Sequence, residues 1–126
     1  MDSKIATTES LEMVRTISKD VMTFHHHYHI LYDLARDMGH VNYLEIGTWN
    51  GASACLMLQR PDTSVVTIDT GEYVKKDTVI SNLNKFNIYN NFFCYLESDS
   101  HQPSTRVQVK RFFPEGVDIL LSLIHI

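Results

Sequence analysis

The stretch "NYLEIGTWNGASA" (residues 42–54) passes from an apolar run into two glycines, with an acid just before the first glycine. The apolar run, residues 41–46, is short and ends at a glycine, which is typical of a buried strand. Residues 52–60, "ASACLMLQR", contain strong helix formers and follow the glycines directly. The stretch therefore predicts a strand, a glycine turn and a helix in immediate succession.

The same alternation continues along the chain. Further strands are predicted at residues 64–69, 92–96 and 117–120, and helices at 76–86 and 105–113, although valines at 107 and 109 also fit a strand. An apolar stripe over residues 21–38 predicts a leading helix that Gly39 terminates. Alternating strands and helices indicate βαβ units on a parallel sheet. We expect a Rossmann-like three-layer αβα sandwich with a mostly parallel sheet, truncated after about its fourth strand.

Composition limits the classes of function. A chain of 126 residues forms at most one domain, and its net charge of −4 argues against a nucleic-acid partner. The polar start has no signal-peptide core, and no apolar run reaches the roughly 20 residues that span a membrane. Cys55 and Cys94 suggest reduced thiols. We therefore expect a cytoplasmic protein that binds a small molecule and no membrane; the oligomeric state is left open.

Candidate site residues lie where the predicted strands end. Because the carboxyl ends of parallel strands meet at one edge of a sheet, these residues are expected to lie close together. Any one of the acids alone fits a solvated loop, so the prediction depends on their joint placement. The candidate binding residues are Glu45, Gly47, Gly51, Asp69, Asp99 and Ser100.

The charge at this edge favours a cationic ligand over a phosphate. "EIGTWNG" lacks the G-x-G-x-x-G pattern of dinucleotide sites, and Glu45 lies where phosphates would approach. Like charges a few ångströms apart in a poorly solvated cleft repel each other by several kcal/mol. S-adenosylmethionine carries a sulfonium and an ammonium, which Glu45 would attract, while backbone amides of the turn receive its carboxylate. Gly47 lets the backbone approach the ligand without a Cβ.

The segments "YLEIGTWNGASA", "SVVTIDTG" and "LESDS" occur in that order and resemble the class I S-adenosylmethionine-dependent methyltransferases, particularly the small-molecule O-methyltransferase-like branch. The resemblance covers residues 20–120 and implies that they form the cofactor-binding part of a methyltransferase domain. By position, Glu45, Gly47 and Gly51 would surround the methionine moiety. The implied reaction transfers the sulfonium methyl group to a hydroxyl of a small molecule or sugar.

The later motifs of the resemblance concern the nucleoside. Asp69 would match the acid that binds both ribose hydroxyls, and Asp99 with Ser100 would match the loop beside the adenine. Tyr73 is either a residue over the cofactor or a surface aromatic. Thr48 and Trp49 fall inside the first-motif loop and receive no separate role.

The resemblance ends at the C-terminus. Relatives in this branch continue the fourth strand as "VDILFIDGDH", whose acids and histidine lie at the reaction site and in some members bind a divalent metal. Here "VDIL" is followed by "LSLIHI", which fits an apolar strand but also matches the translated start of a transposase-based sequencing adapter. We expect residues 121–126 to be adapter-derived and the natural reading frame to continue from about Leu120. Catalytic residues are therefore unassigned, and we expect the chain as given to be inactive as a methyltransferase.

Residues 1–19 are expected to be a polar extension. An NAD(P)-binding oxidoreductase and a noncatalytic module that binds an adenosine ligand or a protein remain alternative functions. "FHHHYH" (24–29) suggests either a metal site or a polar helix flank; no cysteine or acid nearby completes a first shell, so no metal site is predicted.

Overall fold

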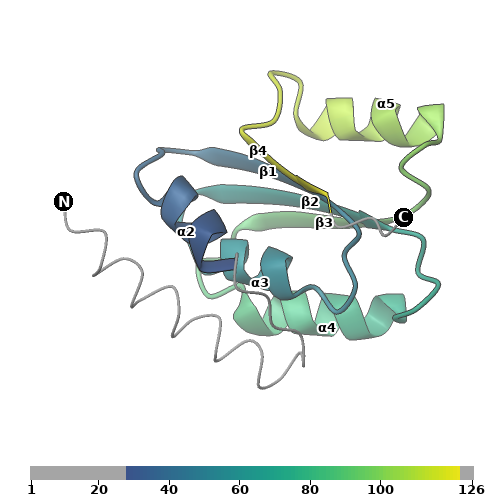
Figure 1. Ribbon diagram of the computed structural model, residues 1–126, viewed down its shortest axis with the longest axis horizontal. Helices are drawn as coiled ribbons and strands as arrows, with labels where there is room; N and C mark the ends of the chain where they lie inside the picture. The colour runs from purple at the N-terminus through teal and green to yellow at the C-terminus, as the bar shows by residue number, and fades with distance from the viewer. Residues whose placement is uncertain (1–27, 123–126) are drawn as a thin grey trace.

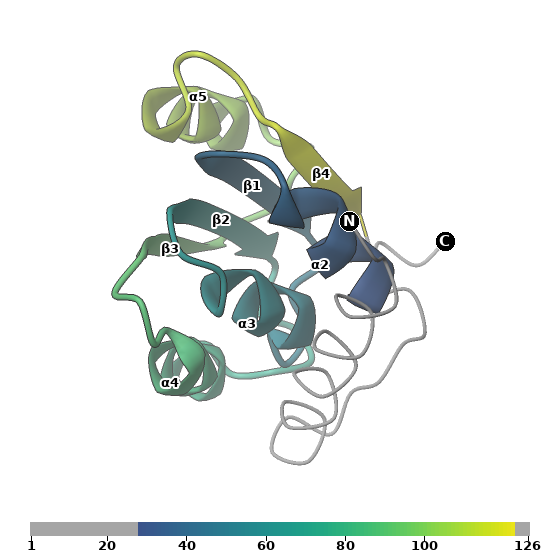
Figure 2. The ribbon, with the colours of Figure 1, turned by 90° about the vertical axis from the view of Figure 1, so that its left-hand side faces the viewer.

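The computed structural model describes residues 28–122 of the chain (Figure 1). The elements run in the order α2 (Tyr28–Arg36), β1 (Val41–Ile46), α3 (Ala52–Leu58), β2 (Thr63–Asp69), α4 (Lys76–Phe86), β3 (Phe92–Glu97), α5 (Pro103–Phe112) and β4 (Ile119–Ser122). The four strands form one parallel sheet in the order β3-β2-β1-β4. Helices α2, α3 and α4 cover one face of the sheet and α5 lies on the other (Figures 1 and 2). The predicted Rossmann-like α/β fold is confirmed.

Strand β1 is central, and its alternation divides the core in two. Val41, Tyr43 and Glu45 are fully buried on the face covered by α2 and α3. Leu44 and Ile46 point to the opposite face, where they pack with the end of α5. This period of two is what a strand between two helical layers requires, because successive side chains alternate between faces.

The strand boundaries differ slightly from those predicted. β4 begins at residue 119 rather than 117, because Asp118 uses its side chain to pair with β1: its Oδ2 accepts a hydrogen bond from the Asn42 amide at 2.7 Å. β4 also includes Leu121 and Ser122, the first two residues of the segment expected to be adapter-derived. Within the described chain, the leading helix ends at Arg36, three residues before Gly39.

Several predictions fall outside the described residues: the extension at 1–19, the start of the leading helical stripe, and the residues 123–126. The same applies to most of the histidine motif at 24–29.

Cys55 and Cys94 belong to the two different core clusters and form no disulfide, in agreement with the sequence. Between residues 28 and 122, no helix is both long and apolar enough to cross a bilayer.

Gly51 connects the glycine turn to the helical layer. Its φ is +92°, in the left-handed region, and it directly precedes α3. A Cβ placed there would meet Leu83 Cδ2 at 3.5 Å and Val79 Cγ1 at 3.6 Å, both on α4. These are ordinary contact distances, so the requirement for glycine comes from the backbone conformation and not from lack of space.

We predict that Gly51→Ala lowers the free energy of unfolding by about 1–2 kcal/mol, the cost of a left-handed conformation for a residue with a Cβ. Urea denaturation followed by circular dichroism measures the change. Gly39→Ala is the matched control: its Cβ would meet nothing within 4 Å, and its φ is not positive. Equal stability of the two variants would contradict the assignment of strain to position 51.

Candidate functional site

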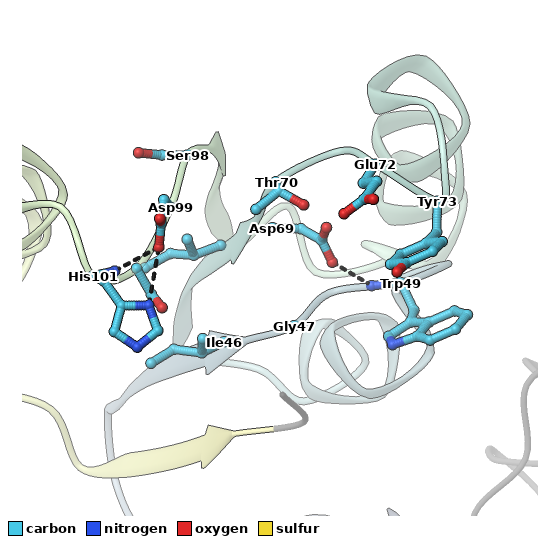
Figure 3. Close-up of a pocket in the computed structure, with 12 residues that line it drawn as sticks. Ile46, Gly47, Trp49, Asp69, Thr70, Glu72, Tyr73, Ser98, Asp99 and His101 are labelled. Atoms are coloured by element: carbon cyan, nitrogen blue, oxygen red, sulfur yellow. Dashed lines mark hydrogen bonds and ion pairs between the residues drawn. The ribbon is translucent and has the colours of Figure 1, made fainter. Parts of the chain in front are cut away.

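A cleft of about 610 Å³ opens where β1, β2 and β3 end (Figure 3). This volume lies within the range of small-molecule sites, and the carboxyl edge of a parallel sheet is where such folds bind ligands. Four of the six predicted site residues line the cleft: Gly47, Asp69, Asp99 and Ser100. The cleft is completed by Ile46, Trp49, Ile68, Thr70, Glu72, Tyr73, Ser98 and His101.

Asp69, the last residue of β2, organises two of the loops around the cleft. Its Oδ2 accepts a hydrogen bond from the backbone amide of Trp49 at 3.0 Å, and its Oδ1 accepts one from the amide of Gly71 at 3.0 Å. A carboxylate has about four acceptor positions, so each oxygen retains capacity for a further donor. Asp69 thus shapes the site and can still bind a ligand hydroxyl.

The loop between β1 and α3 has an unusual backbone. Gly47 has φ +92°, and its amide donates to the carbonyl of Ile68 at 2.8 Å, extending the pairing of β1 with β2 by one residue. Trp49 has φ +53°, which is uncommon for a residue with a side chain. The hydrogen bond to Asp69 holds it there, so the loop conformation and the indole position are linked.

The loop after β3 is closed by local hydrogen bonds. Asp99 Oδ1 accepts from the backbone amide of His101 at 2.8 Å and pairs with its Nδ1 at 3.1 Å (Figure 3). The backbone amide of His101, followed by its side chain, lowers the pKa of Asp99. The Thr105 hydroxyl donates to the carbonyl of Asp99 at 2.8 Å, which joins this loop to the first turn of α5. An ionised carboxylate is therefore presented at this side of the cleft.

The remaining two predicted site residues, Glu45 and Gly51, lie beneath the cleft and do not line it. β1 has the predicted bounds, residues 41–46, and alternation along it turns position 45 toward the helical face. The side chain of Glu45 is fully buried. Direct contact between this carboxylate and a ligand, expected from the sequence, is not available in this conformation. Gly51 packs against α4.

The Glu45 carboxylate is satisfied by hydroxyl groups from three elements. The Tyr43 hydroxyl donates to Oε1 at 2.7 Å, the Ser53 hydroxyl donates to the same oxygen, and the Thr67 hydroxyl donates to Oε2 at 2.9 Å. The Thr67 hydroxyl is also 2.5 Å from the hydroxyl of Thr48, which lies in the loop between β1 and α3, residues 47–51, called the glycine loop below. Burial raises the pKa of Glu45 to about 7, and the nearby charge of Asp69 adds to this, while the three hydroxyls act in the opposite direction.

Two aromatic residues of the cleft form a pair that the sequence did not predict. The rings of Trp49 and Tyr73 are stacked, with centroids 5.6 Å apart and planes 9° from parallel. Tyr73 is 73% exposed and Trp49 39% exposed. The available signal was their position, each two to four residues beyond a predicted binding residue, but their contact depends on the folded shape of two loops.

The charged side chains that line the cleft are mainly acidic. In the part of the chain that the structure describes, the lining includes three acids, Asp69, Glu72 and Asp99, and one histidine, but neither lysine nor arginine. Among residues 28–122, no group of three or more histidine, cysteine or acidic side chains is arranged to hold a metal ion. The cleft therefore presents carboxylates, backbone and aromatic surface to a ligand.

We predict that Glu45→Gln removes a pH dependence of folding stability. Because the folded-state pKa of Glu45 is raised from 4.5 to about 7, its contribution is fully present below pH 4.5 and is lost as the pH rises through about 7. Relative to Glu45→Gln, the wild-type chain should lose roughly 2–3 kcal/mol of unfolding free energy between pH 5 and pH 8. Urea titrations at the two pH values measure this difference.

The exposed Glu115 provides a control, since Glu115→Gln should leave the wild-type pH dependence in place. An identical pH dependence in the wild-type chain and in Glu45→Gln would show that the buried carboxylate does not titrate in this range.

Comparison with known proteins identifies one relative. A scan against protein-family models finds no match to the chain. The chain is 34% identical over 107 residues to an uncharacterized protein of Acanthamoeba polyphaga mimivirus. The match covers 78% of this chain and 46% of the viral protein, so the chain spans about half the length of this relative.

Proposed function

We propose that the chain is the cofactor-binding part of an S-adenosylmethionine-dependent methyltransferase. The observation that carries the proposal is the cleft at the carboxyl ends of three parallel strands, whose described lining residues include three acids and two aromatic rings but no lysine or arginine. S-adenosylmethionine is cationic at its sulfonium and ammonium and has no phosphate. Its charge and its size suit this cleft.

The same lining disfavours a dinucleotide. At about 4 Å, two like charges repel by roughly 4 kcal/mol at the effective dielectric constant of a partly exposed site. A pyrophosphate near Asp69 and Asp99 would meet this repulsion with no lysine or arginine among the described lining residues to offset it. NAD(P) is therefore the less favoured ligand among those that bind at this edge of a parallel sheet.

Three parts of the cleft would contact the cofactor. Asp69 would accept hydrogen bonds from the ribose hydroxyls with the acceptor positions that its two backbone bonds leave open. Asp99 and Ser100 would lie beside the adenine, and Gly47 would let the ligand approach the backbone. All four residues line the one cleft.

Glu45 takes a different part in this proposal. Its carboxylate would support the glycine loop from below through Thr67 and Thr48 rather than contact the ligand. A bound cation above it would favour its ionised form. Cofactor binding and ionisation of Glu45 would thus reinforce each other.

The proposed reaction is in-line transfer of the sulfonium methyl group to a hydroxyl of a small molecule or sugar. The cofactor supplies the reactive group, and alignment of the two reactants supplies much of the acceleration. A hydroxyl acceptor also needs a base or a metal ion to activate it. No residue in the described part of the chain is assigned to that step.

We predict that the 126-residue chain binds S-adenosylmethionine and S-adenosylhomocysteine, and that Asp69→Ala weakens both about ten- to a hundredfold. The loss corresponds to hydrogen bonds to a charged group, worth about 1.5–3 kcal/mol. Isothermal titration calorimetry measures the dissociation constants. NAD, titrated in parallel, should bind far more weakly than either.

Two controls test whether the loss of affinity is specific to the carboxylate of Asp69. Glu115→Ala removes an exposed acid that does not line the cleft and should bind as the wild type does. Asp69→Asn retains one oxygen acceptor and should bind with intermediate affinity. Binding of NAD without binding of either adenosyl ligand would refute the proposed function.

A further inference from the structure

We propose that Trp49, Tyr73 and Glu72 form a subsite for an onium group, either the sulfonium of the cofactor or a quaternary ammonium group of a methyl acceptor. The naming of these two sources rests on the proposed function, whereas the affinity of the subsite for an onium group does not. The subsite lies at the end of the cleft where the loops after β1 and β2 meet (Figure 3).

The two rings are arranged as a surface rather than as part of the core. Their centroid separation of 5.6 Å lies in the range of offset stacks, in which each ring leaves part of its face uncovered. Both rings line the cleft, and Tyr73 keeps 73% of its surface exposed. Folding therefore gains little burial from Tyr73, and its ring face is available to a ligand.

The indole is held in place before any ligand arrives. The Trp49 amide donates to Asp69, and the left-handed backbone at Trp49, with φ +53°, directs the side chain toward Tyr73. Such a conformation in a residue with a Cβ costs free energy and persists only where its surroundings hold it. A fixed indole presents the negative face of its ring system without further loss of conformational freedom.

Two carboxylates share this part of the cleft with the ring pair. Glu72 and Asp69 line the same cleft as Trp49 and Tyr73 (Figure 3), and the Asp69 carboxylate accepts a hydrogen bond from the Trp49 amide. Aromatic faces attract cations within about 6 Å of the ring centroid, most strongly when the cation is poorly hydrated. Onium groups carry their charge on alkyl substituents and are poorly hydrated, so rings plus carboxylates favour them over an ammonium ion of lysine type or an anion.

The chain contains one tryptophan, Trp49, so its fluorescence reports on this subsite directly. The matched ligand pair is S-adenosylmethionine, which is a sulfonium, and S-adenosylhomocysteine, which is the neutral thioether. Tetramethylammonium chloride, against sodium chloride at equal ionic strength, tests the onium group alone. The proteins are the 126-residue wild type, Tyr73→Leu, Tyr73→Phe and the remote control Tyr89→Leu.

We expect the wild type to bind the sulfonium roughly three- to thirtyfold more tightly than the thioether, as a cation–π contact implies. Tyr73→Leu should bring this ratio closer to one, because one of the two rings is lost, while Tyr73→Phe, which keeps the ring, and Tyr89→Leu should retain it. Tetramethylammonium should change the Trp49 emission in every protein except Tyr73→Leu. Circular dichroism of each variant checks the fold.

The two ligand comparisons distinguish a subsite for the cofactor from a subsite for the acceptor, and a failure of the subsite from a failure of the proposed function. If the ratio of the affinities for S-adenosylmethionine and S-adenosylhomocysteine depends on Tyr73, the subsite binds the sulfonium of the cofactor. A Tyr73-dependent response to tetramethylammonium in the presence of saturating S-adenosylhomocysteine, with a ratio that does not depend on Tyr73, assigns it to the acceptor. If neither adenosyl ligand binds, the proposed function fails, and the tetramethylammonium response alone decides the subsite. A Tyr73-independent ratio together with no response to tetramethylammonium would overturn the inference.

Discussion

The buried carboxylate of Glu45 is the constraint around which the site is built. A carboxyl group removed from water must find donors within the protein, because an unsatisfied one costs several kcal/mol. Here the donors come from β1, β2 and α3 through Tyr43, Thr67 and Ser53. Meeting this requirement fixes the relative positions of the three elements directly below the cleft.

The glycine loop is consequently held from two sides. Below it, the Thr48 hydroxyl joins the network through Thr67, and beside the cleft the Trp49 amide is bound by Asp69. Both anchors on β2 lie within three residues of each other. A loop fixed in this way has its binding groups in place before a ligand arrives, which reduces the ordering cost of binding. It also links the protonation state of a buried acid to the geometry of the cleft.

Much of the fold and part of the site could be predicted from local pattern. The strands were predictable because each carries a short apolar run next to a turn signal, and Asp69 and Asp99 follow from where those runs end. The burial of Glu45 was missed although the predicted strand, residues 41–46, has the observed bounds, because contact with a ligand was inferred from the position of the acid beside the glycine and not from the alternation of side chains along the strand. Alternation with Val41 and Tyr43 was the available signal. The hydroxyl partners and the stacking of Trp49 on Tyr73 join segments up to 24 residues apart in sequence, so they required the tertiary structure.

An acidic, aromatic cleft has a particular consequence for methyl transfer. In the proposed reaction the sulfonium becomes a neutral thioether, so the positive charge that the cleft attracts is present in the reactant and disappears in the product. Interactions that favour the cation stabilise the ground state at least as much as the transition state, where the charge is already dispersing, and they do not accelerate the chemical step. Carboxylates and rings in this cleft would therefore act on cofactor affinity and product release. In this proposal, the acceleration of transfer must come from alignment of the reactants and from activation of the acceptor. A rigid glycine loop contributes to the alignment but not to the activation.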